Sequence, residues 1–244
     1  MLFFVAVAAL IAVPAAVVSA QAEPGAVLEF FEYEFEVEIT DIDGIPRDVF
    51  LGQDLLPGDF IQTFDSTAEL RLEPNGTIIK IAPNSSFAIE SIQGREGAQT
   101  SSFDLSLGRV RAVAARAGGN AYEFRTPFAV GGVRGTDFIL EVVPNESNAV
   151  VVQTGALEFT DLASGNSILV NAGESADVFA STFQAVAVPP GQLRELFSGL
   201  EFQAVDPLSV NQGPETQEPT AEPAVEDPEP PESDPDPSQE MPSA

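Results

Sequence analysis

The chain lacks cysteine, histidine and tryptophan, and it holds a single lysine, Lys80, among its 244 residues. Without cysteine it can form no disulfide, no thiolate metal site and no lipidated N-terminal cysteine. Without histidine, the Ser-His-Asp and Cys-His nucleophile systems cannot be built, and zinc sites of the usual kind are excluded. We therefore expect a protein that is not an enzyme, with no catalytic residues, no cofactor and no metal site.

Positive charge is scarce as well. Ten Lys and Arg residues face 38 Asp and Glu residues, which gives a formal net charge of −28. A surface of this sign repels nucleic acid and anionic lipid. Nucleic acid is therefore excluded as a partner, whereas cations, calcium among them, would be attracted diffusely.

The first 22 residues carry no charged side chain and end in small residues, with Ala20 and Ala22 as candidate cleavage positions. Such a run is typical of a secretory signal peptide. The alternative is an uncleaved membrane anchor, because the run is just long enough to span a bilayer. Pro14 and the small residues at its end favour cleavage. We expect an exported protein without stable membrane insertion after cleavage.

Composition changes again near the C-terminus. Residues 207–244 contain ten of the chain's twenty prolines, many acidic residues and no Lys or Arg. This composition cannot bury a core and predicts an extended chain that repels itself. We place a folded domain at 23–200 and a disordered, acidic, Pro-rich tail at 201–244. The tail is either a solvated spacer or a ligand for a basic partner or the cell wall.

Within the domain, hydrophobicity alternates with a period of two, which indicates half-buried β-strands. In the stretch 31–39 five apolar residues share one face and four glutamates the other. The acidic face is either solvated or a binder of calcium. A turn follows at 41–44, which begins like a calcium loop but lacks the later ligands.

The alternation continues to residue 179. A hairpin is predicted from 68–73, the PNG turn at 74–76 and a return strand from 79. Further strands are expected at 87–92, 103–107, 110–114, 121–125, 138–143, 149–152, 156–160, 167–170 and 176–179. Turn residues recur at the spacing of sandwiches and barrels. One short helix, with Pro190 at its start and Gly199 near its end, completes an all-β fold.

Several phrases in order carry a family resemblance. They are LLPGDF with the hairpin after it, LSLGRVRAVAA, YEFRTPFAVGGVRGTDFILEV, VVQTGALEFTD and ILVNAGESADV. This order resembles the FecR domain of bacterial envelope proteins over residues 51–178. The resemblance implies a jelly-roll-like, sandwich-like or solenoid-like domain outside the cytoplasm, in the periplasm or extracellular.

In the regulators that give the family its name, this domain lies beyond a membrane helix. There it receives a signal from an outer-membrane receptor, and a cytoplasmic segment controls a sigma factor. We do not carry that mechanism over, because the apolar run stands at the N-terminus and no later segment is long and apolar enough to cross a bilayer. The expected function is a non-enzymatic binding module whose partner is a protein or an envelope polymer. The alternative is a carbohydrate-binding or carbohydrate-active β domain, which the lack of tryptophan disfavours.

The family phrase at 126–138 is the densest in special residues. It has no lysine after its glycines and no following helix, so it is neither a phosphate loop nor a dinucleotide fingerprint. We interpret it as structural, with bends at the glycines, a hydroxyl cap from Thr136 and an ion pair between Arg134 and Asp137. The residues so assigned are Thr126, Pro127, Gly131, Gly132, Arg134, Gly135, Thr136, Asp137 and Phe138.

A local group of arginines offers a second candidate. Arg109, Arg111 and Arg125 lie close in sequence, and Arg109 and Arg111 share strand parity, so they are expected to face the same way. The group is either an interaction patch for an acidic partner, the chain's own tail included, or a set of solvated and salt-bridged positions.

Overall fold

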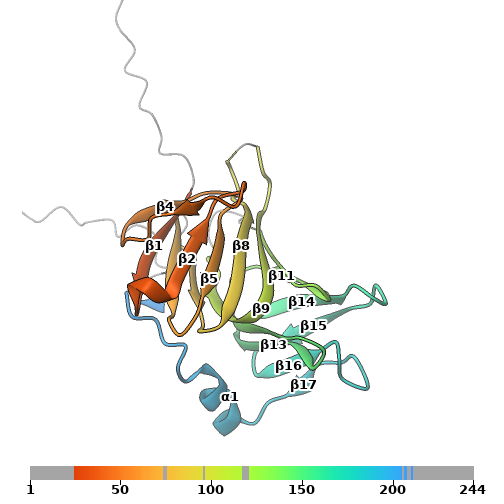
Figure 1. Ribbon diagram of the computed structural model, residues 1–244. Helices are drawn as coiled ribbons and strands as arrows, with labels where there is room; N and C mark the ends of the chain where they lie inside the picture. Colours follow the sequence, from red (N-terminus) through yellow and green to blue (C-terminus); the bar gives the residue numbers. More distant parts are fainter. Residues whose placement is uncertain are drawn as a thin grey trace, which may run out of the picture. The chain divides into compact units, whose positions relative to one another are not determined.

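The computed structural model describes residues 25–73, 76–95, 97–116, 121–204, 206–207 and 210. The predicted signal peptide, two residues of the PNG turn and nearly all of the Pro-rich tail lie outside these residues. In the described part of the chain, strands dominate and the all-β prediction is confirmed. Figure 1 shows the strands in chain order from orange to teal.

The strands are β1 (Gly25–Phe31), β2 (Val37–Thr40), β3 (Pro46–Arg47), β4 (Gln53–Leu55), β5 (Phe60–Thr63), β6 (Ala68–Glu73), β7 (Ile78–Ile81), β8 (Ser85–Ser91), β9 (Ser101–Val113), β10 (Tyr122–Arg125), β11 (Ala129–Val133), β12 (Asp137–Val143), β13 (Ser147–Thr154), β14 (Ala156–Asp161), β15 (Ser167–Asn171), β16 (Glu174–Asp177) and β17 (Val186–Ala187). Two helical elements join them, the 3₁₀ turn η1 (Glu34–Glu36) and the helix α1 (Pro190–Phe197).

Hydrogen bonds link these strands into two layers that share β9. Sheet A has the order β4-β1-β6-β7-β9-β12-β13-β16-β17. Sheet B has the order β3-β2-β5-β8-β9-β10-β11-β14-β15. Every pair is antiparallel except β9 with β10, which is parallel. The sandwich alternative of the sequence analysis therefore describes the architecture.

The core fills the space between the two layers. One cluster of buried apolar side chains draws on both sheets. A row of phenylalanine rings crosses it: Phe103 stacks against Phe87, and Phe124 of sheet B meets Phe138 of sheet A edge to face, with ring centroids 5.0 Å apart. Burial of these large side chains is the main favourable contribution to folding.

Strand β9 changes sheets at Gly108. Its first half, through Leu107, pairs with β8 in sheet B, and its second half, from Gly108, pairs with β12 in sheet A. Gly108 has a φ of +89°, and a Cβ there would lie 2.6 Å from the Cα of Ser85. The buried Ser85 hydroxyl accepts a hydrogen bond from the Arg109 amide at 3.0 Å and so fixes the corner. Only glycine combines this φ with this close approach.

The stretch 31–39 differs from the single strand that its alternation predicts. Strand β1 ends at Phe31, η1 follows, and β2 starts at Val37. Tyr33 is 54% exposed and Phe35 is 92% exposed, so the apolar face is broken where η1 turns the chain. The turn at 41–44 is confirmed, because the Asp41 carboxylate accepts hydrogen bonds from two backbone amides within it. Side-chain acceptance of this kind stabilises turns.

The predicted short helix is present as α1. Ser198 ends it, and Gly199 (φ +83°) turns the chain onto the outer face of sheet A. Residues 197–204 lie against that face, through contacts described below. The chain therefore packs on the domain beyond position 200, and the buried Val210 belongs to the same cluster as Ile78 and Val113.

We expect Gly108→Ala to destabilise the domain by about 3 kcal/mol, since it adds a steric overlap with the Ser85 backbone to the strain of a positive φ. Gly165→Ala is the matched control: Gly165 has a φ of +72° but no atom within 4 Å of its Cβ position. That change should cost about 1 kcal/mol. Urea unfolding of both variants measures the difference, and equal losses would show that the corner tolerates a side chain.

Candidate functional site

The family phrase lies on β11, β12 and the turn between them. Gly131 and Gly132 sit inside β11, which pairs regularly with β10 and β14, so no bend occurs at this pair. A Cβ on Gly131 would lie 3.4 Å from a methyl of Leu157 on the neighbouring strand β14, which is an ordinary van der Waals contact. The second predicted bend is present: Gly135 has a φ of +65°.

Two glycine turns meet at Gly135. A Cβ on Gly155, the residue between β13 and β14, would lie 2.7 Å from the Gly135 carbonyl oxygen. The Thr136 hydroxyl donates to the Ala156 carbonyl at 2.7 Å, across the two turns, in addition to a longer bond to its own turn. Because both turns lack side chains at the contact, their backbones pack together.

The Thr-Pro pair at the start of the phrase caps the turn between β10 and β11. The Thr126 hydroxyl, which is buried, accepts from the Ala129 amide at 2.8 Å and from the Asn148 side chain at 2.7 Å. Asn148 belongs to β13, so this hydroxyl connects the turn of sheet B to sheet A. The geometry gives the Thr a structural role.

The ion pair of Asp137 differs from the one predicted. Its carboxylate accepts two hydrogen bonds from Arg111, at 3.0 and 2.8 Å, and both side chains are nearly buried. The structure shows no ion pair between Asp137 and Arg134, whose side chain is exposed. Arg111 and Asp137 are diagonal neighbours on the paired strands β9 and β12. The register between the strands brings them together, and their separation in the sequence does not reveal it.

The three arginines of the second candidate do not form one exposed patch. Arg109 and Arg111 do share the outer face of sheet A, and Arg109 lies opposite Glu141. Arg111 is covered by residues 197–204, and its Nη1 donates to the Leu200 carbonyl at 3.1 Å. Arg125 lies on sheet B, where it pairs with Glu123. Arg111 thus binds the segment that follows α1.

Exposed apolar side chains gather along a different segment, residues 42–60, which contains β3, β4 and the start of β5. Six large ones are exposed there, Ile42, Ile45, Phe50, Leu51, Leu56 and Phe60. Four aspartates lie among them, at positions 41, 43, 48 and 54. Alternation fails in this stretch of the sequence, and that failure is the signal that could have revealed it. These exposed apolar side chains make the 42–60 segment a candidate interaction surface.

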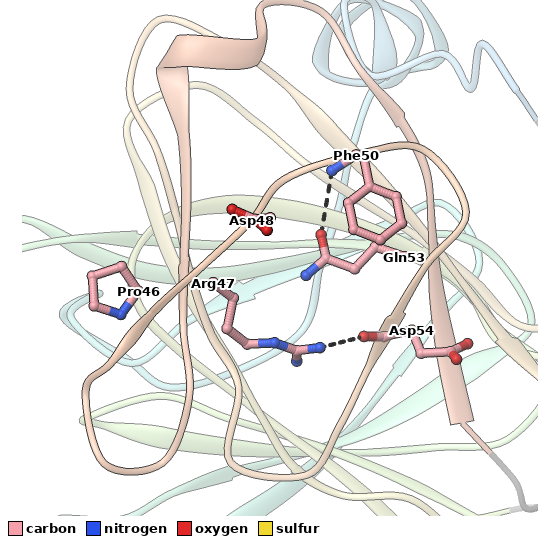
Figure 2. Close-up of a pocket in the computed structure, with 6 residues that line it drawn as sticks. All are labelled: Pro46, Arg47, Asp48, Phe50, Gln53 and Asp54. Carbon is pink, nitrogen blue, oxygen red and sulfur yellow. Dashed lines mark hydrogen bonds between the residues drawn. The ribbon is translucent and has the colours of Figure 1, made fainter.

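Arg47 and Asp59 fix the 42–60 segment to the domain. The Arg47 guanidinium pairs with the buried Asp59 carboxylate and donates to the Asp54 carbonyl at 2.9 Å (Figure 2). The same carboxylate accepts from the Leu56 amide at 2.8 Å. Gly58 (φ +93°) passes beneath the Ile42 side chain. The backbone that carries the exposed apolar residues is therefore fixed by these contacts.

An open pocket of about 470 Å³ lies beside Arg47. Pro46, Asp48 and Phe50 line it, together with Gln53 and Asp54. Figure 2 shows the Gln53 amide turned toward the Phe50 backbone, whose N–H donates to its Oε1 at 3.3 Å. The lining combines an aromatic ring, a cation and two acids, and it carries no arrangement of nucleophile and base.

Burial raises the pKa of Asp59, and the Leu56 amide and Arg47 oppose that rise. Burial likewise raises the pKa of Asp104 on β9, with Glu90 adding to the rise and Arg125 opposing it. Conversely, the hydroxyl of Ser164 and the amide of Ala163 lower the pKa of Asp161. Among the described residues, no group of three acidic side chains is placed to hold a metal ion.

Residues 59–158, from the end of the Asp59 turn to β14, match the family model described as FecR protein. Over these residues the chain is similar to the FecR family. The resemblance drawn from the sequence is confirmed for them. The 42–58 part of the apolar segment lies before the matched region, and α1 with residues 198–204 lies after it.

Two crystal structures of a protein described as a "putative anti-sigma factor" from Parabacteroides distasonis are similar to this chain. Each has 16% sequence identity and a TM-score of 0.43, over 52% of this chain and 58% of the other. The chain thus matches less than two thirds of that protein's length. The comparison with curated proteins found no significant match.

We expect Arg111→Ala to cost about 3–5 kcal/mol, because it leaves the nearly buried Asp137 carboxylate without its cation. Arg134→Ala, at the exposed position in the same family phrase, should change the free energy of unfolding by less than about 0.5 kcal/mol. Chemical denaturation of both variants tests the assignment. A larger loss for Arg134→Ala than for Arg111→Ala would contradict it.

Asp104→Asn should raise the melting temperature at pH 7 by about 1–2 °C. A raised pKa means that Asp104 contributes stability below its ordinary value of 3.8 and loses it as the pH rises through the raised pKa. Asp161→Asn should act oppositely and lower the melting temperature at pH 7, because a lowered pKa gives stability that is present above 3.8. Thermal unfolding at pH 3 and pH 7 tests both signs. The Asp104→Asn gain should vanish at pH 3.

Proposed function

We propose that this protein is a non-enzymatic binding module, exported from a bacterial cytoplasm, that binds a protein partner through the 42–60 segment. The observation that carries the proposal is the exposure of large apolar side chains there: Ile42 is 80% exposed, Phe50 56% and Leu51 58%. Burying one such side chain at an interface is worth about 1.5–3 kcal/mol. A single exposed apolar side chain is normal on a protein surface and needs no explanation. Here, six of them occur within one segment.

The charge around these side chains indicates the chemistry of the partner. Asp41, Asp43, Asp48 and Asp54 surround them, and the whole chain carries −28. A partner with an apolar centre and a basic rim is complementary to this surface, and the long-range field would speed its approach. Nucleic acid and anionic membrane surfaces are repelled by the same field.

The FecR match supports a place outside the cytoplasm, because the resemblance implies an extracytoplasmic domain. The apolar, uncharged N-terminal 22 residues support export through a signal peptide. In the described residues, no helix has the length and hydropathy needed to span a membrane. The absence of histidine and cysteine supports a binding role over an enzymatic one.

The test is photo-crosslinking in the native bacterium with a photoreactive residue at position 51. Leu169 on β15, which is 58% exposed and lies outside the segment, provides the matched control position. We expect one envelope protein to be captured from position 51 and not from position 169. Capture at equal yield from both positions, or a glycan as the only adduct, would contradict the proposal.

The captured protein is then purified and its affinity measured. Phe50→Ser with Leu51→Ser should weaken binding at least tenfold, since both side chains lose apolar contact area. Leu162→Ser with Leu169→Ser removes two equally exposed leucines elsewhere and should leave the affinity unchanged. Raising the salt from about 0.05 M to about 0.5 M should slow association, because screening weakens the attraction of a basic rim.

A further inference from the structure

The outer face of sheet A carries a row of charged side chains. Glu69 on β6, Lys80 on β7 and Arg111 on β9 are direct neighbours by strand register. All three point away from the core, because the residues that flank them fill it. They are nevertheless buried, with 1%, 3% and 8% of their surfaces exposed. Lys80, the chain's only lysine, lies in the apolar run Ile78–Ile81, and that isolated charge is the sequence signal of this row.

Residues 197–204, which we call the covering segment, bury this row. Lys80 Nζ donates to the Glu201 carbonyl at 2.6 Å, and Arg111 Nη1 donates to the Leu200 carbonyl. The Glu69 carboxylate accepts from the amides of Gln203 and Ala204 at 2.7 and 2.9 Å. All four hydrogen bonds involve the main chain of the covering segment. Contacts to the main chain can be made by many sequences that adopt the same backbone conformation.

Three apolar side chains of the covering segment complete the contact. Phe197 and Leu200 pack against Ala82, Ile139 and Val151 of the sheet. Phe202 packs on a second cluster that contains Ile78 and Val113 of the sheet and the buried Val210, which follows the covering segment. The Arg111 guanidinium lies between the two rings, with its carbon 5.1 Å from each ring centroid. The rings thus bind a cation that is already held by Asp137.

Charged residues are an unexpected choice for a face that is permanently covered. Buried ion pairs are often less stabilising than apolar side chains of similar volume, because the charges must be desolvated. On a face that is open part of the time, the same charges are solvated, and they keep the uncovered sheet from presenting a large apolar surface. Glu69 pairs with Lys80 and Arg111 pairs with Asp137, and all four side chains belong to the sheet, so neither ion pair uses a group of the covering segment.

We infer that this face is a peptide-binding groove, which the covering segment occupies in cis and from which a peptide of another protein displaces it. The ligand is an extended peptide with an aliphatic and an aromatic residue two positions apart, as in Leu200 and Phe202. Its carbonyls bind Lys80 and Arg111, and its amides bind Glu69. Pro189 before α1, Pro190 at its start and Gly199 after it mark where the chain changes direction. The groove is separate from the 42–60 segment and its proposed partner.

The test uses the full chain and a labelled synthetic peptide of residues 195–206 as the probe. Leu200→Ser with Phe202→Ser weakens the covering segment without altering the groove. We expect this variant to bind the peptide at least tenfold more tightly than the wild-type chain, in which the tethered segment competes at high effective concentration. A peptide with serine at both positions should not bind. Leu162→Ser with Leu169→Ser should bind the probe as the wild type does.

Two results would overturn the inference. One is a Leu200→Ser, Phe202→Ser variant that unfolds cooperatively but binds the peptide no more tightly than the wild type. The other is a variant that fails to fold, because the covering segment would then be an integral part of the domain. Hydrogen exchange on the unmodified chain gives an independent measure. We expect the amides of Gln203 and Ala204 to exchange at least tenfold faster than those of Lys80 and Arg111, and equal protection would contradict a displaceable segment.

Discussion

The rest of the structure depends on the backbone of Gly108. Its positive φ and its contact with Ser85 allow β9 to leave sheet B and continue in sheet A without a loop. Both sheets therefore contain the same continuous strand, β9. This shared strand fixes the position of one sheet relative to the other. Because β9 is central in both sheets, the phenylalanine row in the core and the charged row on the outside share the same support.

The two faces of sheet A follow different physical rules. The inner face is apolar and fills the core with Val110, Ala112 and their neighbours. The outer face alternates with it and carries Lys80, Arg111 and Glu69, whose charges bind main-chain groups of the covering segment. Because successive side chains of a strand point to opposite faces, core residues and charged residues alternate along the same strand. A change at Arg111 therefore affects the outer contacts without altering the packing of the inner face.

Two surfaces of this chain involve residues outside the region that matches the FecR family, 59–158. Most of the 42–60 segment precedes that region, and it presents apolar side chains outward on a framework held by Arg47 and Asp59. The charged row on the outer face of sheet A lies inside the matched region, whereas the covering segment that buries it follows that region.

Much of the fold could be predicted from the residues. Alternation of apolar and polar side chains determined the all-β class, the hairpin of β6 and β7 and the shared face of Arg109 and Arg111. Pro190 and Gly199 bounded the helix. The break at η1 escaped prediction because alternation continues through Tyr33 and Phe35, although those side chains face solvent. Gly131 and Gly132 suggested a bend, yet both lie in a regular strand that pairs with β10 on one side and β14 on the other.

The partner of Asp137 was decided only by the tertiary structure. Nearness in sequence favoured Arg134, but strand register brings Arg111, 26 residues away, into bidentate contact. The same holds for Glu69, Lys80 and the covering segment, which are joined across more than a hundred residues. A sequence determines local conformation and which face a side chain takes, because these depend on neighbouring residues and a fixed strand period. Which charges meet is decided by register between strands and by what covers them, and those arise only when the whole chain packs.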